Sequence, residues 1–297
     1  LIKNGDPRLA NTLAGKLCDV NTSARVAFNA LQGAQFFSRQ NLLPAVEDRL
    51  RQVAPYVVQP ETYAKGEQAQ VPCLIGNNSS EMVPAYILQG KPTTIENLKP
   101  IVEKAFNVSA DKLLPMYGIN TDADIMKLPG YQLAGDIFIA YATWKWMDVQ
   151  QQTCSKPVYR YVFCRPRPDM VIKNKEAGLA GGVQDKKSDA PATPKIPGAI
   201  HSADIEYEMG NLSTNNVFAW NADDYAVSDI FESYYANFIK TGNPNGLGLP
   251  EWTPINGQAV APVMQIDVNT YLKADPQMEN RYKLIDSGRS AMNTVKK

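Results

Sequence analysis

The chain has 297 residues, 44% of them hydrophobic, so it can bury a large core and lacks the composition of a disordered protein. Thirty basic and thirty acidic side chains cancel to a net charge of zero, which argues against nucleic acid as a partner. The longest apolar stretch, residues 133–149, contains Asp136, Lys145 and Asp148, so no membrane span is expected.

Helices are predicted for residues 1–55, followed by a first strand at residues 71–76. That strand is a short apolar run ended by Gly-Asn-Asn, a pattern typical of a buried strand in a parallel sheet. The segment 93–96 resembles a capping box ahead of helical residues 101–106. Ser109 can cap another short helix.

The second half of the chain alternates between the same two kinds of element. A long helix is predicted over residues 133–151, and Pro157 leads into a strand at residues 158–163. A helix over residues 224–240, a strand at residues 263–268 and a closing helix from Met278 follow. Strands of the buried type alternating with helices indicate the α/β class with a largely parallel sheet.

Residues 173–199 are polar and rich in Gly, Pro and Lys, so they are predicted to form an exposed loop. A bridge between Cys154 and Cys164 is not favoured, because the strand between them covers about 20 Å. Three strands are few for a sheet covered on both faces, and the chain opens as if in mid-fold. The missing strands are expected before residue 1, beside the strand at residues 71–76.

Two polar segments follow predicted strands, where α/β proteins place functional groups. The first strand ends in a loop that presents Glu81, and His201 is the single histidine of the chain. A carboxylate beside an imidazole makes the imidazole a usable general base for a serine hydroxyl. The structural alternative is that Glu81 caps a helix starting near Met82 and that Asp204 is a helix-start carboxylate. With one histidine and separated cysteines, no metal or cofactor is expected.

Four segments, in order, resemble type-B carboxylesterases, the family that includes the cholinesterases. Residues 71–81 resemble the family's acid segment, and residues 198–207, Gly-Ala-Ile-His-Ser-Ala-Asp-Ile-Glu-Tyr, resemble its histidine segment. Residues 238–245 are similar to its Thr-Gly-Asp-Pro-Asn segment, and residues 252–254 to the Trp-Pro motif after it. The similarity runs from about residue 56 to residue 285.

The resemblance implies that residues 1–297 are the C-terminal portion of a single α/β-hydrolase domain, with a mostly parallel sheet flanked by helices. It implies a Ser-Glu-His triad acting on a small-molecule ester through an acyl-enzyme. Glu81 then occupies the position of the acid and His201 that of the base. Asp204, one helical turn on, would support the site as a hydrogen-bond partner.

The sequence departs from the family in one main respect: it contains no Gly-x-Ser-x-Gly and no His-Gly-Gly-Gly segment. The family carries both in an N-terminal half, so that half is the expected partner, in the same protein or as a second chain. The alternative function is that of a non-catalytic, cholinesterase-like adhesion protein. The residues do not fix the compartment; secretion or the periplasm is weakly favoured.

Aromatic residues are expected in two roles. Phe138, Tyr141 and Trp144 are predicted to pack in the core, whereas residues 82–86 and Trp220 are candidates for the wall of a substrate gorge.

Overall fold

The computed structural model describes the chain except for residues 1–61, 64, 173, 178–182, 186–194 and 296–297. The chain divides into two compact units, Leu1–Glu67 and Gln68–Lys297. In the first unit the described residues form a turn, with the amide of Gly66 donating to the carbonyl of Tyr63 at 3.0 Å. The helices predicted for residues 1–55 lie outside the described residues.

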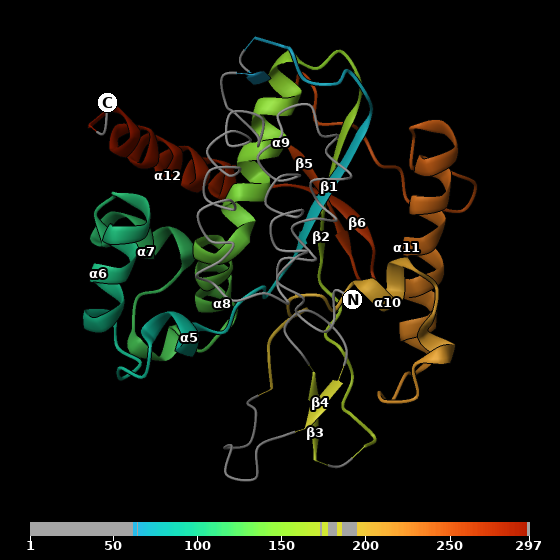
Figure 1. Ribbon diagram of the computed structural model, residues 1–297, viewed down its shortest axis with the longest axis horizontal. Coiled ribbons are helices and arrows are strands. Elements are labelled where there is room, and N and C mark those ends of the chain that lie inside the picture. The colour runs from blue at the N-terminus through green and yellow to red at the C-terminus, as the bar shows by residue number, and fades with distance from the viewer. Residues whose placement is uncertain (1–61, 64, 173, 178–182, 186–194, 296–297) are drawn as a thin grey trace, which may run out of the picture. The chain divides into compact units, whose positions relative to one another are not determined.

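The second unit is built on a four-stranded sheet in the order β1-β2-β5-β6 (Figure 1). The strands are β1 (Cys73–Asn78), β2 (Val158–Phe163), β5 (Pro262–Ile266) and β6 (Tyr271–Ala274). Neighbours among β1, β2 and β5 are parallel, and β6 is antiparallel to β5. The predicted α/β class and mostly parallel sheet are therefore confirmed.

The strand predictions differ from the structure in detail. β2 has the predicted bounds, whereas β1 begins two residues later than expected. β6 was not predicted, because it is four residues long and its exposed sequence lacks the apolar run of the other three. Among the described strands β1 lies at the edge of the sheet, where a further strand was expected.

Helices cover the sheet, and the longest one predicted in the middle of the chain is interrupted. In place of one helix over residues 133–151, helical structure runs through α8, a π-helical segment η4 and then α9. The helices and helical turns of the second unit are α5 (Pro84–Leu88), α6 (Ile95–Phe106), α7 (Ala110–Tyr117), η3 (Asp122–Asp124), α8 (Leu128–Gly135), η4 (Asp136–Ala140), α9 (Tyr141–Thr153), α10 (Ile205–Glu208), η5 (Leu212–Thr214), α11 (Ala222–Thr241) and α12 (Pro276–Val295). No helix among the described residues has the length and apolarity needed to cross a membrane.

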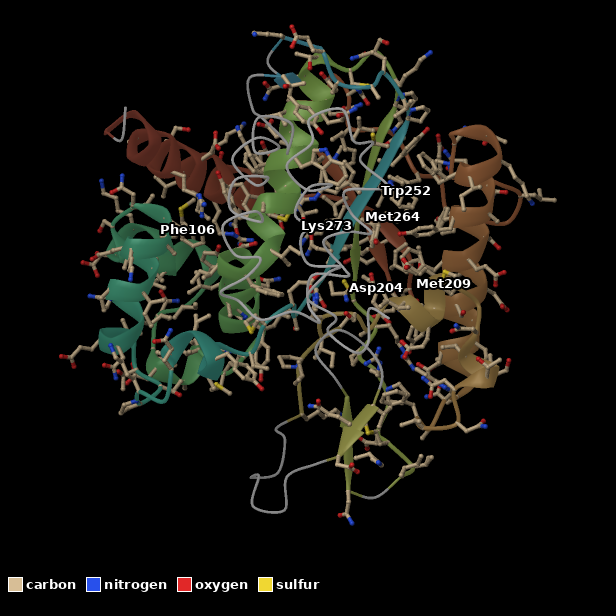
Figure 2. The ribbon with its side chains drawn as sticks, viewed as in Figure 1. Phe106, Asp204, Met209, Trp252, Met264 and Lys273 are labelled. Carbon is tan, nitrogen blue, oxygen red and sulfur yellow. The ribbon has the colours of Figure 1, made fainter. Side chains whose placement is uncertain are left out.

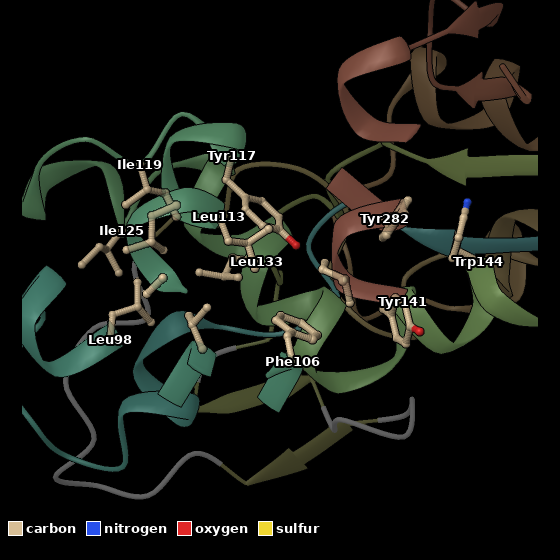
Figure 3. Packing of buried hydrophobic residues seen from close by; sticks show 14 of the residues in the cluster. Leu98, Phe106, Leu113, Tyr117, Ile119, Ile125, Leu133, Tyr141, Trp144 and Tyr282 are labelled. Atoms are coloured by element: carbon tan, nitrogen blue, oxygen red, sulfur yellow. The ribbon is translucent and has the colours of Figure 1, made fainter. Parts of the chain in front are cut away.

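Two hydrophobic clusters form the core of this unit. One joins α6, α7, α9 and α12 to the sheet; in it, Trp144 stacks on Tyr282 with ring centroids 5.0 Å apart (Figure 3). The other lies between the sheet and α11, where Trp252 and Met264 are buried (Figure 2). Because successive residues of a strand point to opposite faces, β2 contributes to both clusters.

The segment of residues 173–199, predicted to form an exposed loop, differs from that prediction in two respects. It contains a small antiparallel hairpin of β3 (Lys175–Ala177) and β4 (Val183–Asp185). Its last residue, Ala199, is fully buried, because residues from Pro197 onward pack beneath the turn after β1. Cys154 and Cys164 are free, at opposite ends of β2, as the length of that strand predicted.

Asp275 precedes α12 and caps it: its Oδ1 accepts from the amides of Gln277 and Met278 at 3.1 Å. Burial alone would raise the pKa of Asp275, but Lys273, 2.9 Å away, and the two amides outweigh burial and lower that pKa. The folded chain therefore stabilises the ionised form of Asp275 relative to the protonated form.

We predict that Asp275→Ala lowers the free energy of unfolding by about 1 kcal/mol at pH 7, measured by urea denaturation. Folding lowers the pKa of Asp275. The difference in the free energy of unfolding between wild type and variant is therefore complete above pH 3.8, and it disappears as the pH falls through the pKa of the folded state. Equal stability of the two proteins at pH 7 would contradict the capping role.

Candidate active site

The turn after β1 and the segment of His201 run side by side beyond the end of the sheet. The amide of Ser79 donates to the carbonyl of Phe163 at 2.9 Å, which continues the pairing of β1 with β2. The amide of Ser80 then donates to the carbonyl of Ala199 at 2.8 Å, within a parallel bridge between Ser80 and Ile200. Backbone hydrogen bonds therefore bring two segments distant in sequence together at the carboxyl ends of the strands.

Gly198 permits this close approach. Its φ of +96° lies in the left-handed region, which side chains with a Cβ rarely adopt. A Cβ at this position would lie 2.4 Å from Oγ of Ser79, the oxygen that accepts from the amide of Ala199 at 2.9 Å. Only glycine satisfies both the backbone angle and the contact.

Glu81 and His201 meet at this end of the sheet, although they are 120 positions apart. Oε2 of Glu81 lies 2.6 Å from Nδ1 of His201, so the two residues that the resemblance pairs as acid and base are within hydrogen-bond distance. Oε1 of Glu81 accepts from the backbone amide of Asn78, also at 2.6 Å. The carboxylate side chain is only 6% exposed, whereas the imidazole is 27% exposed. One partner is thus held in the interior and the other has a face open to solvent.

Burial raises the pKa of Glu81. The hydrogen bonds from the Asn78 amide and His201 act in the opposite direction, and the charge of Asp204 adds to the effect of burial. The two hydrogen bonds thus offset part of the cost of burying the carboxylate and hold it in one orientation beside the imidazole.

Asp204 supports the site through another residue. The amide nitrogen Nδ2 of Asn78 donates to Oδ1 of Asp204 at 2.9 Å and to the carbonyl of Ile200 at 2.8 Å. Asp204 precedes α10, and its side chain makes no capping hydrogen bond. Asp204, expected as a hydrogen-bond partner near the histidine, therefore binds Asn78, the residue whose backbone amide donates to Glu81.

The aromatic ring that the described residues place against His201 is that of Phe138. The two ring centroids are 5.2 Å apart and the planes cross at 81°, an edge-to-face contact. Phe138 is 42% exposed, so its predicted place in the core is wrong, whereas Tyr141 and Trp144 are buried as expected.

The reason for this error is the π-helical segment η4, which contains Phe138. A π turn holds one more residue than an α turn, so it rotates the following side chains out of the phase that an α-helical pattern predicts. Just before it, Gly135 lies against Glu81: a Cβ on Gly135 would be 3.3 Å from the Cβ of Glu81.

Of the residues expected to line a gorge, Tyr86 is exposed on α5. Trp220 packs against Tyr207 and Phe218 in the cluster beneath α11, and its indole nitrogen donates to the carbonyl of Asn215 at 2.7 Å. Trp220 therefore has a packing role. Among the described residues no cluster of three or more His, Cys, Asp or Glu side chains could hold a metal ion.

Comparisons with known proteins agree on the kind of protein. Residues 16–285 match the model of the family described as "Carboxylesterase family". Carboxylesterase 4A of Bos taurus is 26% identical over 241 residues, which are 76% of this chain and 38% of that protein. The chain thus spans well under two thirds of the length of this relative.

Two solved structures share the fold. A thermophilic pNB esterase matches with a TM-score of 0.51 and 14% identity over 93% of this chain and 60% of its own. An esterase of the anaerobe Clostridium hathewayi, which hydrolyses aliphatic aromatic polyesters, matches with a TM-score of 0.50 and 16% identity over 95% and 52%. The expected α/β-hydrolase fold is therefore confirmed.

We predict that Gly198→Ala lowers the free energy of unfolding by more than Gly248→Ala. Gly248 has a similar φ of +80° but open space around its Cβ position, so this control isolates the backbone cost of about 1–2 kcal/mol. The contact with Ser79 adds to that cost at Gly198. Urea denaturation of both variants measures the difference, and equal losses would show that the close approach is unimportant.

Proposed function

The chain belongs to the carboxylesterase family, and on that premise we propose that it serves the hydrolysis of carboxylic esters. In this proposal Glu81 and His201 are the acid and base of a Ser-Glu-His triad. The supporting observation is the 2.6 Å contact between a buried carboxylate and the single histidine of the chain.

The proposed chemistry follows from which imidazole nitrogen is occupied. Nδ1–H of His201 donates to Glu81, which fixes the tautomer and leaves Nε2 with a lone pair. Nε2 accepts the proton of a serine hydroxyl while the serine oxygen attacks the ester carbonyl. The same proton then passes to the departing alcohol oxygen, leaving an acyl-enzyme. Water, deprotonated by Nε2, attacks this intermediate. The bond between the acyl carbon and the serine oxygen breaks, the proton on Nε2 passes to that oxygen, and the carboxylic acid product is released.

Glu81 stabilises the imidazolium that exists between these proton transfers. The amide of Asn78 holds the other carboxylate oxygen, so the carboxylate cannot rotate away from the ring. Phe138 contacts the edge or face of the imidazole and restricts its tilt. Asp204 acts through Asn78 as a positioning residue.

We propose that the nucleophilic serine comes from polypeptide outside these 297 residues, because the sequence contains no Gly-x-Ser-x-Gly. β1 and β6 are the edge strands of the described sheet, and β1 is the one that carries the acid turn, so β1 is the proposed pairing edge for that polypeptide. An unpaired strand edge offers backbone groups to another strand.

The second candidate function is partner binding by a non-catalytic relative. A protein of that kind has no need for a buried carboxylate held against a histidine, and such a carboxylate is costly to bury. The retention of the contact between Glu81 and His201 therefore favours the enzyme.

We predict that, in the protein complete with its serine-bearing portion, His201→Gln lowers kcat for a short-chain p-nitrophenyl ester by about three or more orders of magnitude. Glu81→Gln also lowers kcat, by a smaller factor, because it leaves the imidazole in place but weakens control of its tautomer. Circular dichroism checks that both variants fold.

Glu96→Gln is the matched control, since Glu96 is an exposed carboxylate in the first turn of α6. Its kcat should equal that of the wild type. A His201→Gln protein with wild-type activity would refute the mechanism, and a folded wild type that is inactive on all esters but binds a protein partner would favour the alternative.

A further inference from the structure

A cavity of about 50 Å³ lies behind the turn that holds Glu81. Its lining includes Asn77, Asn78 and Ser79 from the end of β1, Arg160 of β2 and, on the α12 side, Met278, Arg281 and Tyr282. One water needs about 10–15 Å³ measured in this way, so the space admits a group of several heavy atoms. The cavity is separate from the contact between the carboxylate and the imidazole.

Arg160 is the unusual feature of this cavity. It lies in the middle of a central strand and is only 1% exposed, and none of its three guanidinium nitrogens has a hydrogen-bond partner among the residues that the structure describes. Nε of Arg281, which lines the same cavity, also has no hydrogen-bond partner in the described part of the chain. Buried charges are normally paired and hydrogen-bonded, because removing them from water is costly.

The nearby acid does not balance the charge. Asp136 is fully buried and accepts from the hydroxyls of Tyr117 at 2.5 Å and Tyr282 at 2.8 Å. Its Oδ2 lies 3.8 Å from Nε of Arg281. One carboxylate thus faces two guanidinium groups, and the cluster retains at least one positive charge.

Neither packing nor water removes this excess. Arg160 lies 5.4 Å from the ring of Tyr282, and this cation–π contact leaves its N–H donors unsatisfied. Water could accept those hydrogen bonds but carries no negative charge. An anion small enough for the cavity and able to accept from a planar fork of N–H donors would supply both the negative charge and the acceptors.

We propose that this cavity is a binding site for one small carboxylate anion, of the size of acetate or formate, held by Arg160. A carboxylate matches the guanidinium fork with two parallel hydrogen bonds, which a spherical ion cannot do. Oδ1 of Asn77 and Oδ1 of Asn78 have no hydrogen-bond donor among the described residues either, and they are suited to a water that accompanies the anion. The inference does not depend on ester hydrolysis.

The test compares sodium acetate with sodium gluconate at equal ionic strength, since gluconate carries the same carboxylate on a chain too bulky for about 50 Å³. Acetate should raise the Tm of the full chain by a few degrees at about ten times its Kd, with saturation. In gluconate, Arg160→Met should melt above the wild type, because it removes an uncompensated buried charge. The Tm of Arg160→Met should be the same in acetate as in gluconate.

Arg289→Met is the control: it removes an exposed arginine from the same helix as Arg281 and should keep the full response to acetate. Isothermal titration of acetate into the wild type gives a second, direct measurement if Arg160→Met does not fold. A wild type that binds no acetate, or an Arg160→Met protein that responds like the wild type, would overturn the proposal.

Discussion

Glu81 is a carboxylate held almost wholly out of water, and the arrangement of the neighbouring segments follows from that position. Two donors reach it: the amide of Asn78 from its own turn, and Nδ1 of His201 from a segment 120 residues later. Burial still raises its pKa, so the donors offset only part of the desolvation cost. A carboxylate in this position requires both segments to stay together, and the glycine at position 198 and the bridge at Ser80 hold them so.

The sheet fixes where that contact can form. β1 and β2 are paired in parallel over six residues, and Gly76 lies opposite Tyr161, whose ring occupies the space that a Cβ at Gly76 would need. Below it, Phe163 stacks on Phe231 of α11 with centroids 5.4 Å apart. Because dense packing resists small displacements, the end of β1 cannot shift without disturbing the cluster beneath α11. The packing of the core thus sets the position of the turn that carries Glu81.

The parts of this structure that were predictable from sequence are those with a local pattern. β2 was predicted because Pro157 is followed by a run of valine and aromatic residues that only Arg160 interrupts. Glu81 and His201 were identified as a pair because both follow predicted strands in segments resembling one family. Phe138 was misplaced because a π turn changes the helical phase, and no residue type announces such a turn. The hydrogen bond of Asn78 to Asp204 joins the end of β1 to the residue before α10, 126 positions apart, and no sequence pattern predicts it.

The same π turn connects the proposed anion cavity with the histidine. Asp136 begins η4 and lines the cavity, and Phe138, two residues on, contacts the imidazole of His201. In an α-helix, residues i and i+2 point in widely different directions, and here one is buried against arginine while the other reaches solvent beside the histidine. π turns are often found at functional sites, and in this chain one π turn carries a residue of the cavity and a residue that contacts the histidine. The five residues of η4 thus include both the buried acid of the cavity and the exposed ring beside the histidine.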